Sequence, residues 1–240
     1  MPVFSRGAVH LHYLDVGDPS APAVLLLAPG GMNSVAMLWR RQLWDPIECL
    51  PDHRIIAMDQ RNAGRSLAPV SGADGWHSYT DDQLALMDHL GLERFAVIGM
   101  CIGGPFILSL CRAAPRRVRA AVMFQPIGLW ENRAEFFGLF DSWAAAIGPR
   151  HPEAREDDWA RFREAMFGGP ELFVMSMPET AAIKTPMLLF AGMDRHHPRQ
   201  TAERLACTLP NASCVATWKA AVHVPDVHAR VHGFLRAHAG

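Results

Sequence analysis

Six short apolar runs recur along the chain and indicate its fold class. They cover residues 23–27, 54–58, 95–98, 120–124, 187–190 and 214–216. None of them alternates apolar with polar positions, and continuous apolar runs of this length are typical of strands that are covered on both faces. Several of the segments between them have helical character. The pattern therefore predicts an α/β fold with a mostly parallel central sheet flanked by helices.

Capping and breaking residues predict where some of the helices begin and end. Thr80 is a candidate N-cap for a helix that ends at Gly91. Pro198 opens another helix that runs to about residue 209, and a last helix spans residues 225–237. Near the N-terminus, residues 9–14 alternate in polarity, which predicts an antiparallel edge hairpin.

The rhythm of strands and helices is interrupted from residue 127 to residue 184, where amphipathic helical segments occur without a convincing strand run. We therefore expect a core domain formed by residues 1–126 and 185–240, with residues 127–184 inserted as a helical cap or lid. The insertion contains Trp130, Trp143 and Trp159. These rings either pack within the insertion or line a pocket beneath the lid.

Composition and charge exclude several classes of protein. Half of the 240 residues are hydrophobic and 20% are charged, which suits one substantial core and argues against disorder. The formal net charge is −1, so no nucleic-acid partner is implied. The longest apolar stretch is far below the roughly 20 residues that cross a bilayer, and the N-terminus lacks the features of a signal peptide. We expect a cytoplasmic protein with no membrane partner.

One of the five cysteines stands in an unusual setting. The odd count and the lack of any CxxC or CxxH pair argue against a disulfide framework and a zinc site. Cys101 lies in the segment Gly-Met-Cys-Ile-Gly-Gly, directly after a predicted strand and before a predicted helix. Small neighbours are needed where a nucleophile is placed on a tight, strained strand-to-helix turn. The segment predicts a nucleophile elbow in which the helix N-terminus and a nearby imidazole lower the pKa of the thiol.

Four further segments, taken together with this elbow, resemble the motifs of a known family. They are residues 28–34 (APGGMNS), 58–66 (MDQRNAGRS), 190–198 (FAGMDRHHP) and 219–225 (KAAVHVP). Together with GMCIGG they resemble α/β-hydrolase-fold enzymes of the capped, esterase-like kind over nearly the whole chain. Pro29 stands where the family's HGG-type oxyanion loop has histidine, and Asn62 stands where its DxRGxGxS segment commonly has glycine. Dienelactone hydrolases and polyester synthases resemble the chain in their GxCxGG elbow.

The resemblance implies a catalytic triad in the chain order nucleophile, acid, base. Cys101 is the expected nucleophile, Asp194 the acid after a late strand, and His223 the base after the final strand. The neighbouring His196 and His197 are expected only to shape the loop of Asp194. The oxyanion hole is expected from the backbone N–H groups of Ile102 and of Gly31 or Met32.

The expected function is hydrolysis of a small to medium carboxylic ester, lactone or thioester through a thioester acyl-enzyme, with no cofactor and no metal. The expected partner is a small-molecule acyl substrate, which Trp130, Phe136 and Trp143 contact in the lid. Two alternatives stay open: an acyltransferase that uses the same triad, and a ligand-binding protein that has kept the fold without catalysis. The oligomeric state, including a homodimer, also stays open.

Overall fold

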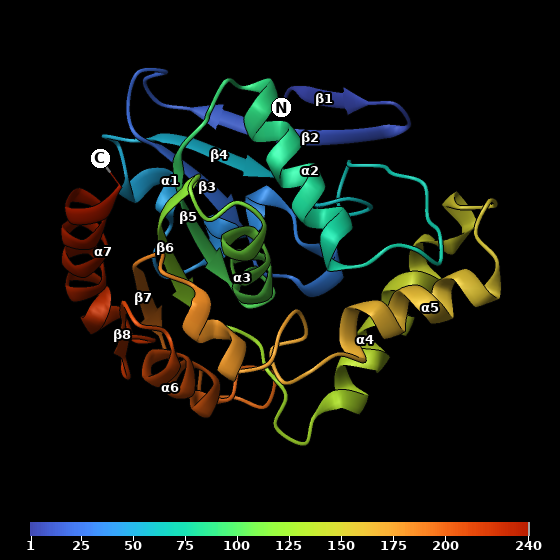
Figure 1. Ribbon diagram of the computed structural model, residues 1–240. Coiled ribbons are helices and arrows are strands. Elements are labelled where there is room, and N and C mark those ends of the chain that lie inside the picture. The colour runs from blue at the N-terminus through green and yellow to red at the C-terminus, as the bar shows by residue number, and fades with distance from the viewer. Residues whose placement is uncertain (240) are drawn as a thin grey trace.

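The computed structural model describes residues 1–239, which form an eight-stranded sheet in the order β1-β2-β4-β3-β5-β6-β7-β8 (Figure 1). The strands are β1 (Val3–Arg6), β2 (Val9–Val16), β3 (Ala23–Leu27), β4 (Arg54–Met58), β5 (Phe95–Met100), β6 (Val118–Phe124), β7 (Met187–Phe190) and β8 (Ala212–Val215). Strand β2 pairs antiparallel with β1 and with β4, and the other neighbours are parallel. The predicted mostly parallel sheet and its edge hairpin are confirmed.

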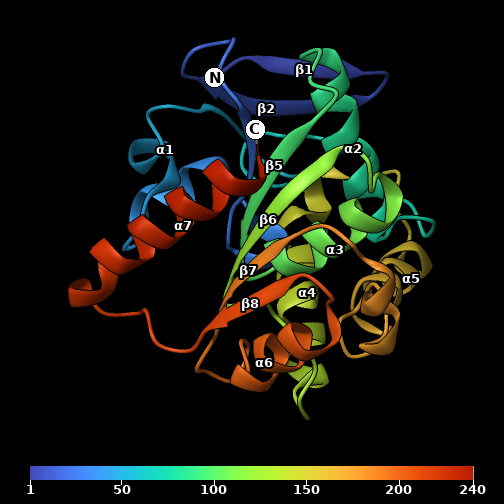
Figure 2. The same ribbon diagram turned by 60° about the vertical axis from the view of Figure 1, so that its left-hand side comes forward.

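Helices cover both faces of the sheet. They are α1 (Pro46–Cys49), α2 (Trp76–His89), α3 (Gly103–Ala113), α4 (Arg133–Ile147), α5 (Glu156–Phe167), α6 (Arg199–Thr208) and α7 (Val224–His238). Short 3₁₀ turns are η1 (Gly31–Asn33), η2 (Ala36–Arg41), η3 (Gly148–Arg150), η4 (Pro178–Ala182) and η5 (Ala221–His223). Helices α2, α3 and α6 pack on one face, and α1 and α7 pack on the other (Figure 2).

Burial on both faces explains why the strands read as continuous apolar runs. Leu25 and Val97 belong to the core beneath α2 and α3, whereas their neighbours Leu26 and Ile98 belong to the core beneath α7. All of these side chains have no exposed surface. Because successive side chains of a strand point to opposite faces, neither face offers a polar position, and the alternation of a half-exposed strand disappears.

Helix α2 begins five residues before the position that the sequence indicated, since its N-cap is Gly75 and not Thr80. The expected cap, Thr80, is 2% exposed, and its hydroxyl lies 2.8 Å from that of Ser109 on α3. The chain instead turns into the helix at Gly75, whose N–H donates to the hydroxyl of Ser78. Threonine at this position therefore joins two helices in the core, and the prediction of an N-cap at Thr80 is wrong.

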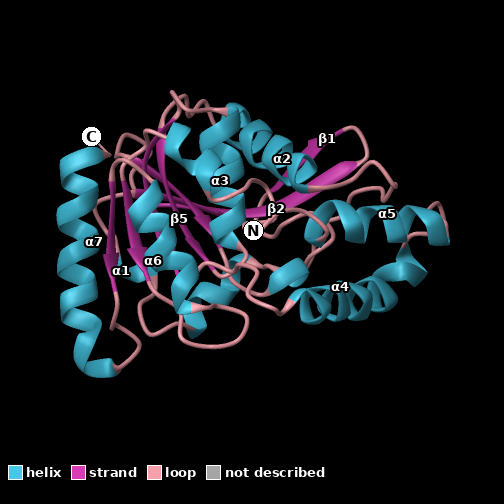
Figure 3. Ribbon diagram, turned by 60° about the horizontal axis from the view of Figure 1, so that its bottom comes forward, coloured by secondary structure: helices cyan, strands magenta, loops and turns pink. Residues whose placement is uncertain are grey.

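The segment between β6 and β7 is helical, as its pattern indicated. Helices α4 and α5 pack against each other and project beyond the sheet (Figure 3). Their interface is aromatic: the ring of Trp143 lies 5.4 Å from that of Phe140 and 5.9 Å from that of Phe162. Helix α4 also lies against η1, so the pair extends over one edge of the sheet.

None of the helices formed by residues 1–239 combines the length and the apolar character that crossing a membrane requires.

Candidate active site

Cys101 occupies a tight turn between β5 and α3. The strand ends at Met100, Cys101 has a left-handed φ of 61°, and the helix begins at Gly103. A Cβ atom on Gly99 would lie 2.8 Å from the carbonyl oxygen of Gly103, and one on Gly103 would lie equally close to that of Leu27. Because no side chain fits at either glycine, the strand and the helix approach closely and hold the thiol at the carboxyl edge of the sheet.

Three backbone amides surround the sulfur of Cys101. The N–H groups of Ile102, Gly30 and Gly31 donate toward it. Burial raises the pKa of the thiol above its ordinary value, the three amides lower it, and the negative charge of Asp194 raises it again. Because burial prevails, Cys101 is protonated at neutral pH, contrary to the expected lowering of its pKa. Attack by this sulfur therefore requires a base.

The loop after β3 is held in place by its own residues and by Asp59. Gly30 and Gly31 have φ values of 118° and 59°, which glycine adopts without strain. The carboxylate of Asp59 accepts the N–H of Ala36 at 2.9 Å, and the hydroxyl of Ser34 donates to a backbone carbonyl at 2.7 Å. These bonds preorganise the amides that face Cys101.

The amides around the sulfur overlap with the predicted oxyanion hole. The amides of Ile102 and Gly31 were expected there, whereas that of Gly30 was not. The pair of consecutive glycines at positions 30 and 31 is the signal in the sequence that could have indicated it, because both residues have a positive φ. Met32 is 4% exposed. Its place in the oxyanion hole stays a prediction.

Asp194 lies in the loop after β7 and is held by the imidazole of His197 and the ammonium group of Lys219. Its Oδ1 lies 2.7 Å from Nδ1 of His197, and its Oδ2 accepts from Nζ of Lys219 at 3.3 Å. The backbone N–H groups of His196 and His197 also donate to Oδ1. Burial by itself would raise the pKa of Asp194, but His197 and Lys219 outweigh it and hold the pKa below its ordinary value. The carboxylate is therefore ionised.

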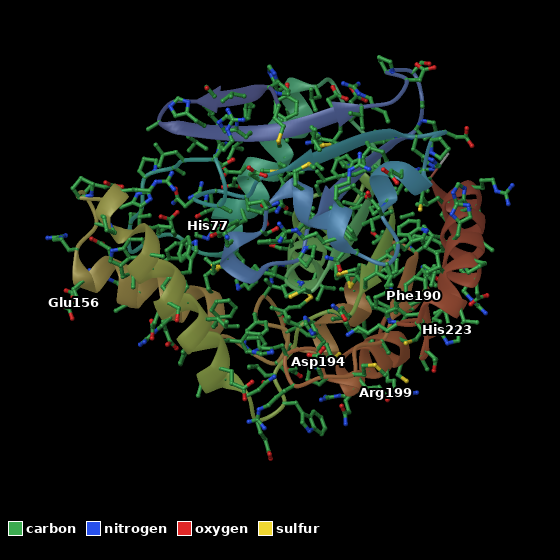
Figure 4. The ribbon with its side chains drawn as sticks, turned by 180° about the vertical axis from the view of Figure 1, so that it is seen from behind. His77, Glu156, Phe190, Asp194, Arg199 and His223 are labelled. Carbon is green, nitrogen blue, oxygen red and sulfur yellow. The ribbon has the colours of Figure 1, made fainter. Side chains whose placement is uncertain are left out.

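His223 lies at the N-terminal end of α7, after β8. Within residues 1–239 its side chain has no hydrogen-bond or ion-pair partner, and the bonds of Asp194 go to His197 and Lys219 instead. Figure 4 shows Asp194 and His223 along the same lower edge of the molecule. The structure thus places both predicted residues at the carboxyl edge of the sheet without pairing them, and the role of His223 stays a prediction.

His197 holds the position toward Asp194 that was expected of His223. Its side chain is 14% exposed, and its Nε2 atom is buried with no hydrogen-bond partner in the described part of the chain. Burial lowers the pKa of His197, outweighing the opposite effect of Asp194, so the ring is neutral at pH 7. Spacing is the signal that could have identified this residue: it follows Asp194 by three positions and directly precedes Pro198.

The three aromatic residues predicted to contact substrate have different surroundings. Trp130 is 50% exposed and lines a surface hollow with Asp194. Phe136 is 2% exposed, and its ring lies 5.9 Å from that of His196. Trp143 is 8% exposed within the interface of α4 and α5. Trp130 and Phe136 thus lie near the Asp194 loop, while Trp143 packs within the helical segment.

The raised pKa of the partly buried Cys101 thiol predicts how its alkylation depends on pH. We expect the rate of its reaction with iodoacetamide to keep rising above pH 8.5, about the ordinary pKa of a cysteine thiol, because only the thiolate reacts. Peptide mass spectrometry after timed labelling measures the rate at Cys101 and at the exposed Cys207 in the same digest. Full reactivity of Cys101 at pH 6 would show instead that the amides outweigh burial.

The sequence matches known proteins over a part of the chain that includes the Cys101 turn. A family profile described as "alpha/beta hydrolase fold" matches residues 23–168. A putative carbamate hydrolase RutD of Variovorax paradoxus is 32% identical over 144 residues, which are 58% of this chain and 52% of that protein. A probable proline iminopeptidase of Streptomyces coelicolor is 33% identical over 121 residues, 48% of this chain and 36% of that protein. The chain thus spans about half, or less, of the length of these relatives.

Solved structures share the fold over nearly the whole chain. The enol-lactonase from Burkholderia xenovorans LB400 has a TM-score of 0.72 at 20% identity, covering 98% of this chain and 100% of that one. The 2-hydroxy-6-oxo-6-phenylhexa-2,4-dienoate hydrolase from Rhodococcus sp. strain RHA1 has a TM-score of 0.69 at 22% identity, covering 98% and 97%. The profile match extends over more than half of the chain and includes the Cys101 turn. The chain therefore belongs to the alpha/beta hydrolase fold family.

Proposed function

We propose that this protein is a hydrolase that cleaves a small to medium carboxylic ester, lactone or thioester through a thioester acyl-enzyme at Cys101. The observation that carries the proposal is the left-handed turn at Cys101 with three backbone amides donating toward its sulfur. Donors grouped in this way match the negative charge that develops on a carbonyl oxygen during acyl transfer. Related proteins named as a carbamate hydrolase and an enol-lactonase are consistent with attack at a carbonyl.

In the proposed reaction an imidazole takes the proton of the Cys101 thiol while the sulfur attacks the acyl carbon. The carbonyl electron pair moves onto oxygen, where the N–H groups of Ile102 and Gly31 stabilise it by roughly 3 kcal/mol each. Collapse of this intermediate breaks the bond to the leaving group, which receives the proton from the imidazolium. Water, deprotonated by the same imidazole, then opens the thioester and restores the thiol.

The remaining triad roles are proposed as the chain order suggests. Asp194 is the acid that orients the imidazole, and its ionised state suits that role. His223 is the base indicated by its position after β8. For His223 to act in this way, Asp194 must release its bond to His197 or to Lys219 and form one to His223.

We propose that residues 127–184 act as the lid of this site, over a core formed by residues 1–126 and 185–240. Helix α4 lies against η1, the turn that contains Gly31. Phe136, on α4, points an apolar ring toward the Asp194 loop. These contacts support an acyl pocket between the helical segment and the carboxyl edge of the sheet, which would exclude water and select acyl groups by size.

A second candidate function is ligand binding without catalysis. It is favoured by the raised pKa of Cys101 and by the lack of a bond between Asp194 and His223 in the described structure. In that case the same pocket would hold an acyl compound and release it unchanged.

A burst assay with p-nitrophenyl esters of increasing acyl length tests the proposal. We expect a burst of p-nitrophenol close to one per enzyme, and a covalent acyl adduct on Cys101 detected by intact-mass and peptide analysis. Cys101→Ala should abolish both, and Cys207→Ala, which removes an exposed thiol, should keep both. The absence of any adduct and of Cys101-dependent turnover would favour the binding protein. Turnover that rises well above hydrolysis when an amine or thiol acceptor is added would identify an acyltransferase.

A further inference from the structure

Asn132 stands at the start of α4, yet its side chain does not cap that helix. Asparagine at a helix N-cap ordinarily accepts an N–H group from the first turn. Within residues 1–239, the Asn132 side chain accepts none of those N–H groups, although its carbonyl accepts the N–H of Glu135 at 3.1 Å. Asn132 is 1% exposed. An amide that commonly stabilises a helix end is therefore bonded to other partners in the interior.

The amide of Asn132 instead joins two loops. Its Oδ1 accepts the N–H of Trp130 at 2.8 Å, and its Nδ2 donates to the carbonyl of Gly128 at 3.2 Å. The same Nδ2 donates to the carbonyl of Arg195 at 2.7 Å, and Arg195 directly follows Asp194. Two bonds thus hold the amide within its own loop, and the third and shortest fastens the loop of Asp194.

The backbone before Asn132 is turned toward this contact. Glu131 has a left-handed φ of 55°, which a residue with a Cβ adopts at a cost in energy. The side chain of Arg195 returns to the same turn, where it pairs with Glu135 and donates to the carbonyl of Glu131 at 3.5 Å. Side chains therefore bond in both directions between the start of α4 and the loop of Asp194.

The chain that leads to Asn132 is bonded at its other end to the Cys101 turn. The N–H of Cys101 donates to the carbonyl of Phe124 at 3.0 Å, and the carbonyl of Cys101 accepts the N–H of Ile127 at 3.2 Å. Residues 125–132, which we call the connecting segment, thus run from the expected nucleophile to the expected acid and are fixed at both ends.

We propose that Asn132 is a positioning residue of the active site, whose amide sets the separation of Asp194 and Cys101 by fastening the acid loop to the connecting segment. This role rests on the proposed function and adds to it a residue outside the triad. Asn132 acts through Asp194 and not on the reacting atoms. Because a displacement of about 1 Å can slow an enzyme about 100-fold, one well-placed bond can decide the rate of turnover.

The thiol of Cys101 reports the position of Asp194 without any turnover. Its pKa responds to burial, to three backbone amides and to the negative charge of Asp194, which raises it. If the acid loop moves away, that charge acts less strongly and the pKa of the thiol falls. The pH dependence of alkylation at Cys101 therefore measures the coupling that Asn132 provides.

The first variant is Asn132→Ser, which adds no charge and whose side chain is one bond too short for the Arg195 carbonyl. We expect kcat/KM with a p-nitrophenyl ester to fall about 10- to 100-fold. We also expect the midpoint of the pH profile for iodoacetamide labelling of Cys101 to fall, so that labelling at neutral pH becomes about two- to fivefold faster. Greater access to the thiol would raise the rate equally at every pH, so the midpoint distinguishes a displaced charge from a loosened fold.

The matched control is Asn211→Ser. Nδ2 of Asn211 also donates to a backbone carbonyl, that of Lys184 at 2.8 Å, but it lies just before β8, at the amino edge of the sheet. The substitution removes the same kind of bond far from the proposed site. It should keep both the kcat/KM and the labelling profile of the parent protein.

A second variant acts on the connecting segment without touching the Asn132 amide. A Cβ on Gly128 would lie 2.4 Å from the hydroxyl and 2.7 Å from the methyl group of Thr201 on α6. Gly128→Ala should therefore displace the segment and reproduce both effects of Asn132→Ser. Adding Thr201→Ala removes the two colliding atoms and should restore most of the parent behaviour. This pair decides the question if Asn132→Ser does not fold.

The outcomes separate this role from the function on which it rests. If Asn132→Ser folds and keeps both its kcat/KM and its labelling profile, the proposed role of Asn132 is overturned. It is also overturned if activity falls while the labelling midpoint stays, because Asn132 then only stabilises the fold. If Cys101→Ala keeps the burst, the proposed hydrolase function fails, and the labelling midpoint by itself decides whether Asn132 positions Asp194.

Discussion

Replacing Cys101 by glycine is expected to abolish ester turnover and to give a protein about 1 kcal/mol more stable than the alanine variant at the same position. Both substitutions remove the sulfur, so both should reduce kcat/KM to the background rate. They differ in backbone strain, because φ at this residue is 61°. Alanine in the left-handed region suffers a steric conflict that glycine avoids, and this conflict exceeds the usual entropic disadvantage of glycine.

A matched pair of glycine and alanine at an ordinary helical position provides the control. Gly138 is exposed within α4, has no positive φ and has no atom close to where a Cβ would stand. There alanine should be the more stable residue by about 1 kcal/mol. Urea unfolding of the Cys101→Gly, Cys101→Ala and Gly138→Ala variants measures both differences. If alanine is also preferred at position 101, the turn is not strained in solution, and the elbow loses its physical basis.

Replacing Arg61 by methionine should lower the free energy of unfolding by about 3–5 kcal/mol. The guanidinium of Arg61 donates to Asp82 at 2.8 Å and to Asp74 at 2.5 Å, and all three side chains are at most 10% exposed. The variant would leave two buried carboxylates without this partner. Arg6 also pairs with Asp82, but its half-exposed side chain replaces only part of what is lost.

An exposed ion pair provides the control for this second prediction. Arg230 pairs with Asp226 on the surface of α7 at a spacing of four residues. Arg230→Met should change the free energy of unfolding little, since solvent screens such pairs. Equal effects of the two substitutions in urea unfolding would mean that the buried ion pairs of Arg61 contribute no more to stability than an exposed pair does. The expected difference would show that the MDQRNAGRS segment stabilises the fold by connecting the loop after β4 to α2.

The strands and the elbow could be predicted from the sequence because both depend on neighbouring residues. Three of the six apolar runs coincide with β3, β4 and β7, and the others overlap β5, β6 and β8. Burial of a strand on both faces produces a continuous apolar run that can be recognised within about five residues. The glycines around Cys101 mark a turn in which the backbone leaves no room for a Cβ, and this too is a local requirement.

Positions whose partners come from distant parts of the chain could not be predicted in this way. Threonine is a residue type that often caps helices, yet the hydroxyl of Thr80 bonds to Ser109 and so joins two packed helices. The glycine-rich turn predicted a reactive thiol, but its pKa is raised, because burial depends on everything packed around it. Whether residues 127–184 move as a lid depends on contacts between helices and loops, and it stays a proposal.

The partners of Asp194 show most clearly where local and tertiary information differ. The sequence by itself determined an α/β sheet, a strained cysteine turn and an acidic loop after β7, since periodic burial and steric exclusion act over a few residues. The tertiary structure decided that Asp194 bonds to His197 and Lys219 and that His223 lies apart from it. Side chains at the end of a sheet meet according to how several loops pack in space, and no short segment records that packing.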